Sequence, residues 1–222
     1  AENGFTGAPA ITIEADGVAQ HWQDLGQFWQ IEHQYVKPYP ICRWAHAAID
    51  ATSALIREND LTLEQIAAIQ VNTFHEGACL FQGMPDDTSK AQYSLPFAVA
   101  TMVAYGRIGV EHITGAGLSD LLVSSIVQRI SVSEVARHSD RFPQSRIADV
   151  VITLTGGRQV ASGDVHARGG PEAPLERREI EEKFMEFEAL LKDFTTAVET
   201  NDGAKLGALF AEDSVYNDGF YG

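Results

Sequence analysis

The sequence predicts an α+β fold with an antiparallel sheet, helices packed on that sheet, and a helical C-terminal segment. Two periods in the apolar residues predict it. Residues 44–57 and 118–129 follow the 3.6-residue period of a helix, whereas residues 68–74 and 148–155 have the two-residue alternation of a strand. Segments of both kinds follow one another before residue 170, and a long charged helix is predicted after it.

The N-terminal part predicts extended chain followed by a sharp corner. Residues 10–14 permit a short strand, and residues 29–36 predict an extended segment. Pro38 and Pro40 then fix their own φ angles and keep the residues before them out of the helical region. Helix 44–57 begins directly after this proline corner, which we define as residues 37–46.

The middle of the chain predicts a short helix, a strand and a longer helix. Thr62 and Gln65 have the spacing of a capping box, so a short helix is expected there. Strand 68–74 follows it. Residues 90–105 predict one helix in which Pro96 lies near a bend or in the first turn.

Three further strands complete the predicted sheet. Helix 118–129 precedes strand 131–136, and strands 148–155 and 159–165 come later in the chain. Glycines 156 and 157 lie between the last two strands, which predicts an antiparallel hairpin.

The C-terminal part is predicted to be helical. Residues 169–174 are rich in glycine and proline and predict a linker. A charged helix over residues 176–199 follows, then a second small helix from Asp202 to Phe210 and a strand over residues 214–216.

Composition narrows the function. With 222 residues and 45% apolar residues, the chain can bury a core. Its formal charge of −15 argues against nucleic acid and against an anionic membrane surface as partners. We find no apolar run of the roughly 18 to 20 residues that a membrane span needs. The sequence does not begin with Met, and both of its ends resemble the interior of a longer sequence, so we expect a fragment of a longer protein.

The two cysteines, Cys42 and Cys79, are expected to be reduced thiols in the cytoplasm, because a domain of this size needs no disulfide. His75 and Glu76 lack the spacing of metal ligands, so no metal site is predicted. The turn glycines carry no phosphate-binding pattern.

The proline corner holds the candidate functional residues. Lys37 and His46 are the candidate catalytic residues, because an ammonium suits a carboxylate or a developing carbanion and an imidazole titrates near working pH. Arg43, Cys42 and Tyr39 are the candidate substrate-binding residues. A guanidinium can hold a carboxylate through two parallel hydrogen bonds.

Each of these residues also has an ordinary structural interpretation. Lys37 could be a solvated surface lysine, and His46 a capping or core histidine. Arg43 could pair with a nearby acid. Cys42 is better explained as a small buried apolar residue than as a nucleophile, and Tyr39 as a packing residue.

Several separated motifs resemble the MmgE/PrpD family, which includes 2-methylcitrate dehydratases, cis-aconitate decarboxylases and an iminodisuccinate epimerase. The motifs are residues 4–7, 37–50, 94–100 and 166–172, the last leading to residues 183–184. They occur in the family's order. The resemblance covers roughly residues 1 to 190 and suggests the family's smaller α+β lid domain.

The resemblance implies a cleft between this lid and a helical domain that is mostly absent here. It implies a small polycarboxylate substrate, no metal or organic cofactor, and a homodimer. Lys37 matches an active-site lysine of the family. Cys42 stands where the decarboxylases have a histidine, and Phe97 where they have a tyrosine. These departures argue against cis-aconitate decarboxylation and leave dehydration, isomerisation or epimerisation open.

We therefore expect residues 1–170 to form the lid domain and residues 171–192 the return segment towards the helical domain. Residues 193–222 resemble the opening of a SnoaL-like domain. The predicted function is part of a metal-independent, dehydratase-like lyase or isomerase acting on a small hydroxy di- or tricarboxylic acid. The alternative is a non-catalytic small-molecule binding or interaction module built on the lid fold with a SnoaL-like tail.

Overall fold

The computed structural model describes residues 26, 27, 29, 35–170 and 173–209. The predicted strands at residues 10–14 and 214–216, and the motif at residues 4–7, lie outside the described residues. The chain divides into two units, Ala1–Tyr35 and Val36–Gly222. All the elements below belong to the second unit.

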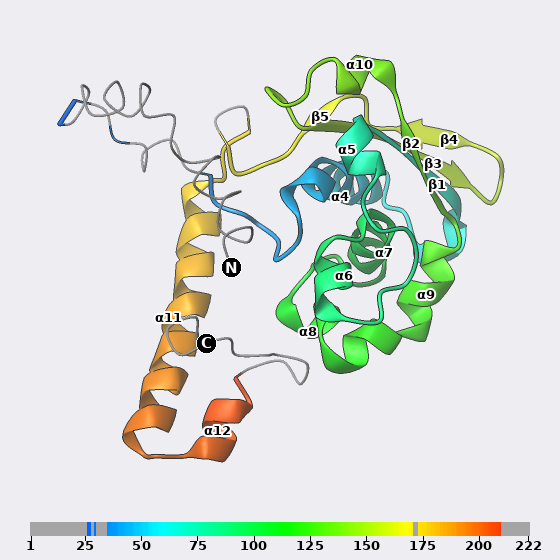
Figure 1. The fold of residues 1–222 in the computed structure, drawn as a ribbon. Helices are drawn as coiled ribbons and strands as arrows, with labels where there is room; N and C mark the ends of the chain where they lie inside the picture. The colour runs from blue at the N-terminus through cyan, green and yellow to red at the C-terminus, as the bar shows by residue number, and fades with distance from the viewer. Residues whose placement is uncertain (1–25, 28, 30–34, 171–172, 210–222) are drawn as a thin grey trace, which may run out of the picture. The chain divides into compact units, whose positions relative to one another are not determined.

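The described residues form an α+β fold, which confirms the predicted class (Figure 1). The helices are α4 (Arg43–Glu58), η2 (Leu63–Gln65), α5 (His75–Ala78), α6 (Thr88–Gln92), α7 (Leu95–Tyr105), α8 (Val110–Ile113), η3 (Gly115–Ser119), α9 (Leu121–Val127), α10 (Ala136–Ser139), α11 (Arg177–Glu199) and α12 (Gly203–Gly207). The strands are β1 (Ile66–Thr73), β2 (Ile130–Glu134), β3 (Ile147–Leu154), β4 (Gln159–Ala161) and β5 (Val165–His166).

The sheet is mixed rather than antiparallel throughout. Its strand order is β2-β1-β3-β4, and β5 also pairs with β3. Strand β3 runs antiparallel to β1, β4 and β5, as predicted. The prediction is wrong for β1 and β2, which pair in parallel. Helices α5 to α9 form the crossover between these two strands, and such a connection returns the chain in the same direction.

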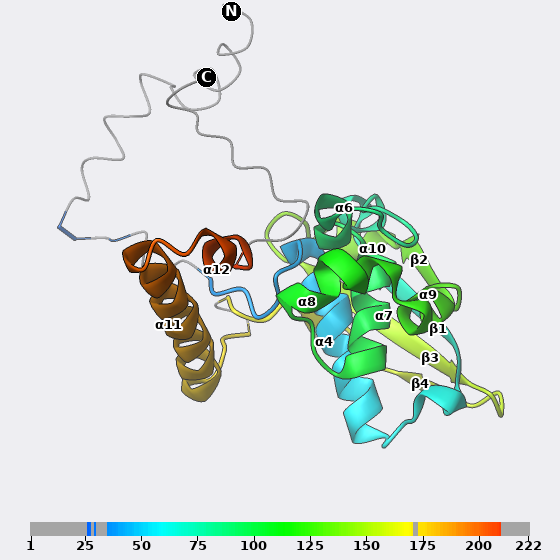
Figure 2. The same cartoon turned by 90° about the horizontal axis from the view of Figure 1, so that it is seen from below.

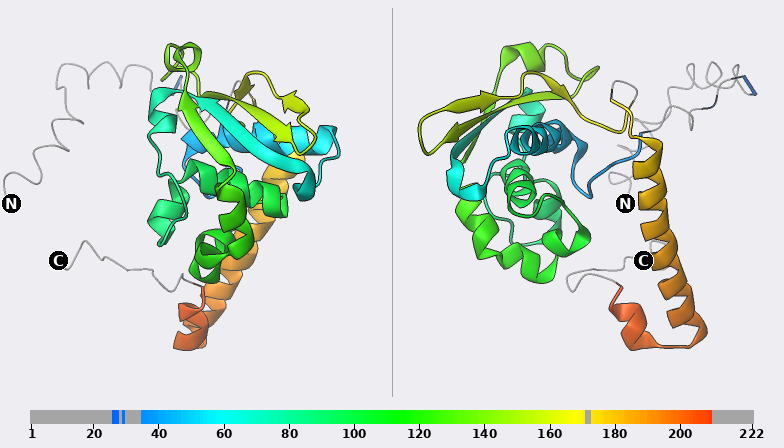
Figure 3. Two further views of the ribbon diagram at one scale, coloured as in Figure 1. Left: turned by 90° about the vertical axis from the view of Figure 1, so that its right-hand side faces the viewer. Right: turned by 180° about the vertical axis from the view of Figure 1, so that it is seen from behind.

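Helices cover one face of the sheet. In β1, Ile69 and Val71 are buried whereas Gln70 and Asn72 are only partly buried, which is the alternation of a strand with one covered face. Helix α4 packs against β3 and β5, and α7 packs against α4 (Figure 3). The core therefore lies between the sheet and these two helices.

Helices α4 and α7 are buried nearly all round. Every residue of α4 from position 45 to 52 is buried, and four of these are alanines, whose small side chains allow close approach to the sheet and to α7. Helix α4 confirms the helix predicted at residues 44–57.

The helix predicted at residues 90–105 is two helices, α6 and α7. They separate at Ser94, whose side chain accepts a hydrogen bond from the backbone N–H of Phe97 at 3.3 Å and so caps a new helix. Pro96 lies in the first turn of α7, where the missing N–H costs nothing. Gly106 ends α7 with a φ of 68°.

The predicted hairpin at glycines 156 and 157 is confirmed. Gly157 has a φ of 81°, and Leu154 donates its backbone N–H to Arg158 at 2.8 Å across the turn. The strand predicted at residues 159–165 is broken into β4 and β5. Between them, Ser162 Oγ accepts the backbone N–H of Val150 at 2.9 Å in place of a ladder bond.

The C-terminal helices are as predicted where they are described. Helix α11 is one long helix, and α12 packs against it (Figure 2). Asp202 caps α12 by accepting the backbone N–H of Lys205 at 2.9 Å. Over the described part of the chain, no helix combines the length and the apolarity that crossing a membrane requires.

Candidate functional site

The proline corner is fixed by backbone hydrogen bonds on both sides. Before the prolines, Val36 donates its N–H to the carbonyl of Gly169 at 3.1 Å. After them, Cys42 donates its N–H to the carbonyl of Gln92 at 2.7 Å and serves as the N-cap residue of α4. The corner therefore holds its side chains on a defined backbone.

Gly169 permits the close approach of two chain segments at the corner. Its φ is 91°, and a Cβ at this position would lie 2.0 Å from the carbonyl oxygen of Val36. Both the left-handed conformation and the contact require glycine. The motif at residues 166–172 thus has a structural reason for its glycine.

A buried carboxylate joins the corner to this motif. Asp50, in α4, is 8% exposed. It accepts hydrogen bonds from Tyr39 Oη at 2.8 Å and from Arg168 Nε at 2.9 Å. Arg168 also donates Nη2 to Tyr39 Oη at 3.3 Å. Its Nη1 lies 2.5 Å from Glu179 of α11, so one guanidinium connects three segments of the chain.

Tyr39 is held as a neutral phenol in this cluster. Burial, followed by the charge of Asp50, raises the pKa of the Tyr39 hydroxyl above its ordinary value of 10. The hydroxyl therefore stays protonated and donates a hydrogen bond to Asp50.

His46 lies behind Tyr39, in the core. Its ring is fully buried and makes an edge contact with the Tyr39 ring at 5.2 Å between centroids. Nε2 lies 3.1 Å from the carbonyl oxygen of Ile41. Because a carbonyl only accepts, Nε2 carries the proton of the neutral ring, and Nδ1 is left as an acceptor without a hydrogen-bond partner among the described residues.

Three cations act on His46. Burial lowers the pKa of His46 to about 4, the hydrogen bond to Ile41 opposes this, and the charges of Lys37, Arg43 and Arg168 lower it further. The ring is therefore neutral at pH 7. Of these cations, Arg168 is also paired with Asp50 and Glu179.

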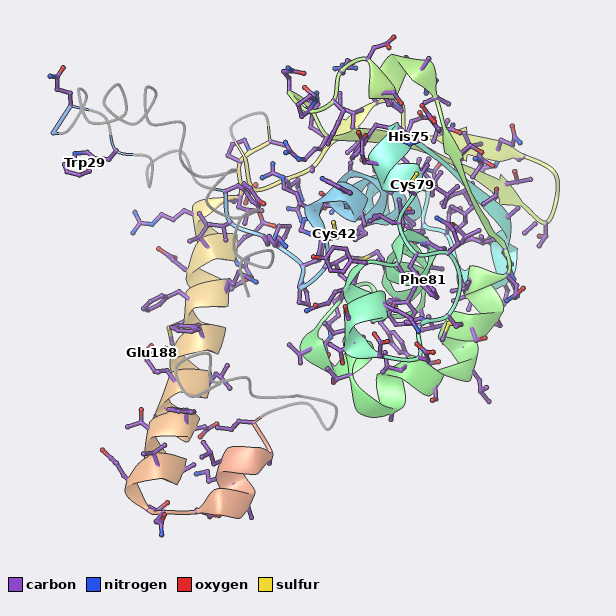
Figure 4. The ribbon with its side chains drawn as sticks, viewed as in Figure 1. Trp29, Cys42, His75, Cys79, Phe81 and Glu188 are labelled. Atoms are coloured by element: carbon purple, nitrogen blue, oxygen red, sulfur yellow. The ribbon has the colours of Figure 1, made fainter. Side chains whose placement is uncertain are left out.

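The candidate residues differ in exposure. Lys37 is exposed, whereas Arg43 and Cys42 are partly buried. Arg43 donates Nη2 to the carbonyl of Ala167 at 3.4 Å. Cys42 is a free thiol at the start of α4 (Figure 4). Phe97, at the position of the family tyrosine, is fully buried in α7.

A cavity of about 700 Å³ opens beside the corner. Tyr39 and Arg168 are on its wall, and α11 contributes Lys183. Lys37, Arg43, Cys42 and His46 are not among its lining residues. In the described chain Tyr39 and Arg168 thus reach the cavity together, whereas the charges of Lys37 and Arg43 act on the buried His46. The remaining lining residues are Pro38, Pro40, Ser53, Met102, Gly106, Arg107, Ile108, Gly109, Val110, Glu111, Glu179 and Glu182.

Sequence reasoning did not assign roles to Asp50 and Arg168. Both lie inside motifs that carry the family resemblance, so the motifs marked them as important. The two residues that form this ion pair are 118 positions apart in the sequence, and no local sequence pattern predicts such a contact.

A second cluster has the spacing of metal ligands. Ligand atoms of His138, Asp149 and Asp164 lie within 4.8 Å of one another. Arg137 pairs with Asp149, and Arg141 with Asp164 at 2.8 Å. The two guanidinium groups already balance the charge of both carboxylates, while Nδ1 of the buried His138 has no hydrogen-bond partner among the described residues.

Comparison with known proteins identifies the family. A model described as MmgE/PrpD C-terminal domain matches residues 39–199. The match covers well over half of the chain, which therefore belongs to the MmgE/PrpD family and is a dehydratase-like member of it. No curated protein shows a significant match.

Proposed function

We propose that the chain is the carboxylate-binding part of a metal-independent lyase or isomerase that acts on a small hydroxy di- or tricarboxylic acid. The observation that carries this proposal is the convergence of the charges of Lys37, Arg43 and Arg168 on the neutral ring of His46. Arg168 is already paired with Asp50 and Glu179, so Lys37 and Arg43 are the cations proposed to favour an anionic ligand at this place.

Elimination of water fits such a site. A base removes the proton next to a carboxylate, the electron pair forms a carbon–carbon double bond, and the hydroxyl leaves as water after taking up a proton. Negative charge develops on the carboxylate side during this step, and fixed cations stabilise it. We assign carboxylate binding to Lys37 and Arg43 and proton transfer to His46. Tyr39 and Cys42 complete the proposed binding residues.

The burial of His46 sets a condition on its role. A neutral imidazole can accept a proton at Nδ1, but this atom is buried. Proton transfer therefore requires a rearrangement that exposes Nδ1 when substrate binds.

Further groups from the family's helical domain would complete the active site. Apolar side chains of α11, including Phe184, Met185 and Phe187, are more than half exposed, which supports a covering domain at this helix. We expect the 222-residue chain alone to show no turnover, and robust dehydration by the isolated chain would contradict this division of labour. On the family resemblance we also propose a cytoplasmic homodimer.

The experiment is a turnover screen of the full-length protein against citrate-like acids, followed by the absorbance of the new double bond. We expect activity that survives chelators and falls at least about a hundredfold in Lys37→Ala and in His46→Gln. Lys205→Ala, at an exposed lysine in α12, is the matched control. Unchanged activity in both site variants would remove this assignment.

A second function, a non-catalytic binding module, is favoured by one observation. The His46 ring is bonded to the backbone and the Tyr39 hydroxyl to Asp50, so both groups already have structural roles. In that case the full-length protein would bind carboxylates without converting any of them to product. Lys37→Ala would then weaken carboxylate binding, and there would be no activity for it to change.

A further inference from the structure

The parallel pairing of β1 and β2 brings another cluster of reactive side chains together, separate from the cluster of His138, Asp149 and Asp164. Thr73 and Glu134 are paired at the carboxyl ends of these two strands, and His75 begins α5 with one residue between it and the end of β1. Side chains after the ends of adjacent parallel strands meet at one edge of a sheet, which is a common place for functional groups. Cys79 lies one helical turn after His75 at α5 (Figure 4).

A chain of hydrogen bonds orients the His75 ring. Nδ1 lies 2.8 Å from Glu134 Oε2, and the other carboxylate oxygen accepts Ser139 Oγ at 2.9 Å. Ser139 Oγ in turn accepts the backbone N–H of His75 at 3.0 Å. Because a carboxylate only accepts, Nδ1 carries a proton, and the lone pair of the neutral ring is on Nε2.

That lone pair faces a thiol. Nε2 lies 3.6 Å from Cys79 Sγ, within hydrogen-bond distance for sulfur. The backbone N–H of Cys79 donates to the carbonyl of His75 at 3.0 Å, which fixes the spacing of the two side chains. A thiol, an imidazole and a carboxylate in this order form the arrangement that activates nucleophilic cysteines.

We propose that Cys79 is a nucleophilic thiol that small neutral or cationic disulfides modify, with His75 as its base and Glu134 as a positioning residue. The sulfur of Cys79 attacks one sulfur of the disulfide while its proton passes to Nε2 of His75. The disulfide bond breaks, and the departing thiolate takes the proton from His75. The products are a mixed disulfide on Cys79 and one free small thiol, so atoms and electrons balance without another oxidant.

The surroundings suit this reagent class. Cys79 is exposed, whereas Cys42 is partly buried and lies in the proline corner. The carboxylates of Glu134 and Glu76 both act on His75 and raise its pKa, and the hydrogen bond that His75 donates to Glu134 is the largest cause. Their negative charge favours approach of a cationic disulfide over an anionic one.

The test is the rate of reaction of this chain with cystamine, followed by intact mass and peptide mapping. We expect one adduct, on Cys79. It should form at least about tenfold faster than cystamine reacts with the thiol of reduced glutathione at the same pH. His75→Gln should lower the rate by about tenfold or more. Glu134→Gln should lower it less and should shift the pH at which the rate rises. Glu64→Gln, at an exposed carboxylate in η2, should change neither.

Circular dichroism keeps the test independent of folding. The Glu134→Gln variant provides the answer if His75→Gln does not fold. The proposal is overturned if Cys42 reacts first, if Cys79 reacts no faster than glutathione, or if the folded variants keep the rate and pH profile of the unchanged chain.

Discussion

Asp50 is the residue that holds the proline corner to the rest of the fold. It accepts hydrogen bonds from the hydroxyl of Tyr39 and from both the side chain and the backbone N–H of Arg168. These partners come from segments far apart in the sequence. Removing the carboxylate leaves a half-buried guanidinium and a buried hydroxyl with fewer hydrogen-bond partners. The free-energy cost of leaving such groups unpaired exceeds the net stabilisation that their pairing provides.

We therefore predict that Asp50→Asn lowers the free energy of unfolding by about 2 to 3 kcal/mol, allowing for the partial exposure of Arg168. Urea denaturation measures it. Asp86→Asn, at an exposed carboxylate paired with Lys90, is the matched control and should leave the transition nearly unchanged. Equal effects of the two substitutions would contradict the role given to Asp50.

His46 makes stability depend on pH. Its pKa is about 4 in the folded chain and 6.5 as the ordinary value. Between pH 4 and pH 6.5, the unfolded chain therefore binds a proton at His46 that the folded chain does not bind. The contribution is fully present above pH 6.5 and is lost as the pH falls towards 4.

The expected loss is about 3 kcal/mol over this range, because each pKa unit corresponds to about 1.4 kcal/mol. Urea denaturation at several pH values, compared between the unchanged chain and His46→Gln, isolates it from other titrating groups. A pH dependence that is the same in both chains would show that His46 is not buried as a neutral ring.

At the scale of elements, apolar periodicity predicted most helices and strands, because the apolar residues recur with a helical period in α4 and alternate along much of β1 and β3. The direction of β2 could not be predicted, since a two-residue period is the same for parallel and antiparallel partners. Short helices such as α5 escaped notice because four residues contain barely one helical turn.

The proline corner could be recognised locally, because its prolines and cations are adjacent in sequence. The sequence left a core position for His46 as one of two ordinary interpretations, because its burial depends on how α4 packs between the sheet and α7. The pairing of Asp50 with Arg168 depends on a crossing of two segments at Gly169.

That crossing gives a prediction for the corner as an element. Gly169→Ala should lower the free energy of unfolding by more than about 2 kcal/mol, because it adds a steric conflict with Val36 to the cost of a positive φ. Gly157→Ala is the matched control, with a φ of 81° and no atom within 4 Å of the added Cβ. It should cost only about 1 to 2 kcal/mol in the same urea experiment. Equal losses would show that Val36 and Gly169 do not approach closely.

At the scale of the whole molecule, charge is divided unevenly. The chain is strongly acidic, with 31 acidic and 16 basic residues, which keeps most of its surface unfavourable for anions. At the corner, the charges of Lys37, Arg43 and Arg168 all act on one buried ring, and Arg168 is paired with Asp50 and Glu179. Membership of a dehydratase-like family and the cationic side chains of Lys37 and Arg43 are consistent with one anionic ligand at this place.

The most direct test is calorimetric titration of the chain with tricarballylate, a tricarboxylate that lacks a hydroxyl and cannot be dehydrated. We predict saturable binding that weakens with added salt, and a loss of at least about tenfold in affinity in Lys37→Ala or Arg43→Ala, because a charge-assisted hydrogen bond contributes about 1.5 to 3 kcal/mol. Lys205→Ala should bind as the unchanged chain does. If all four chains bind equally, or none binds, the proline corner is not a carboxylate site.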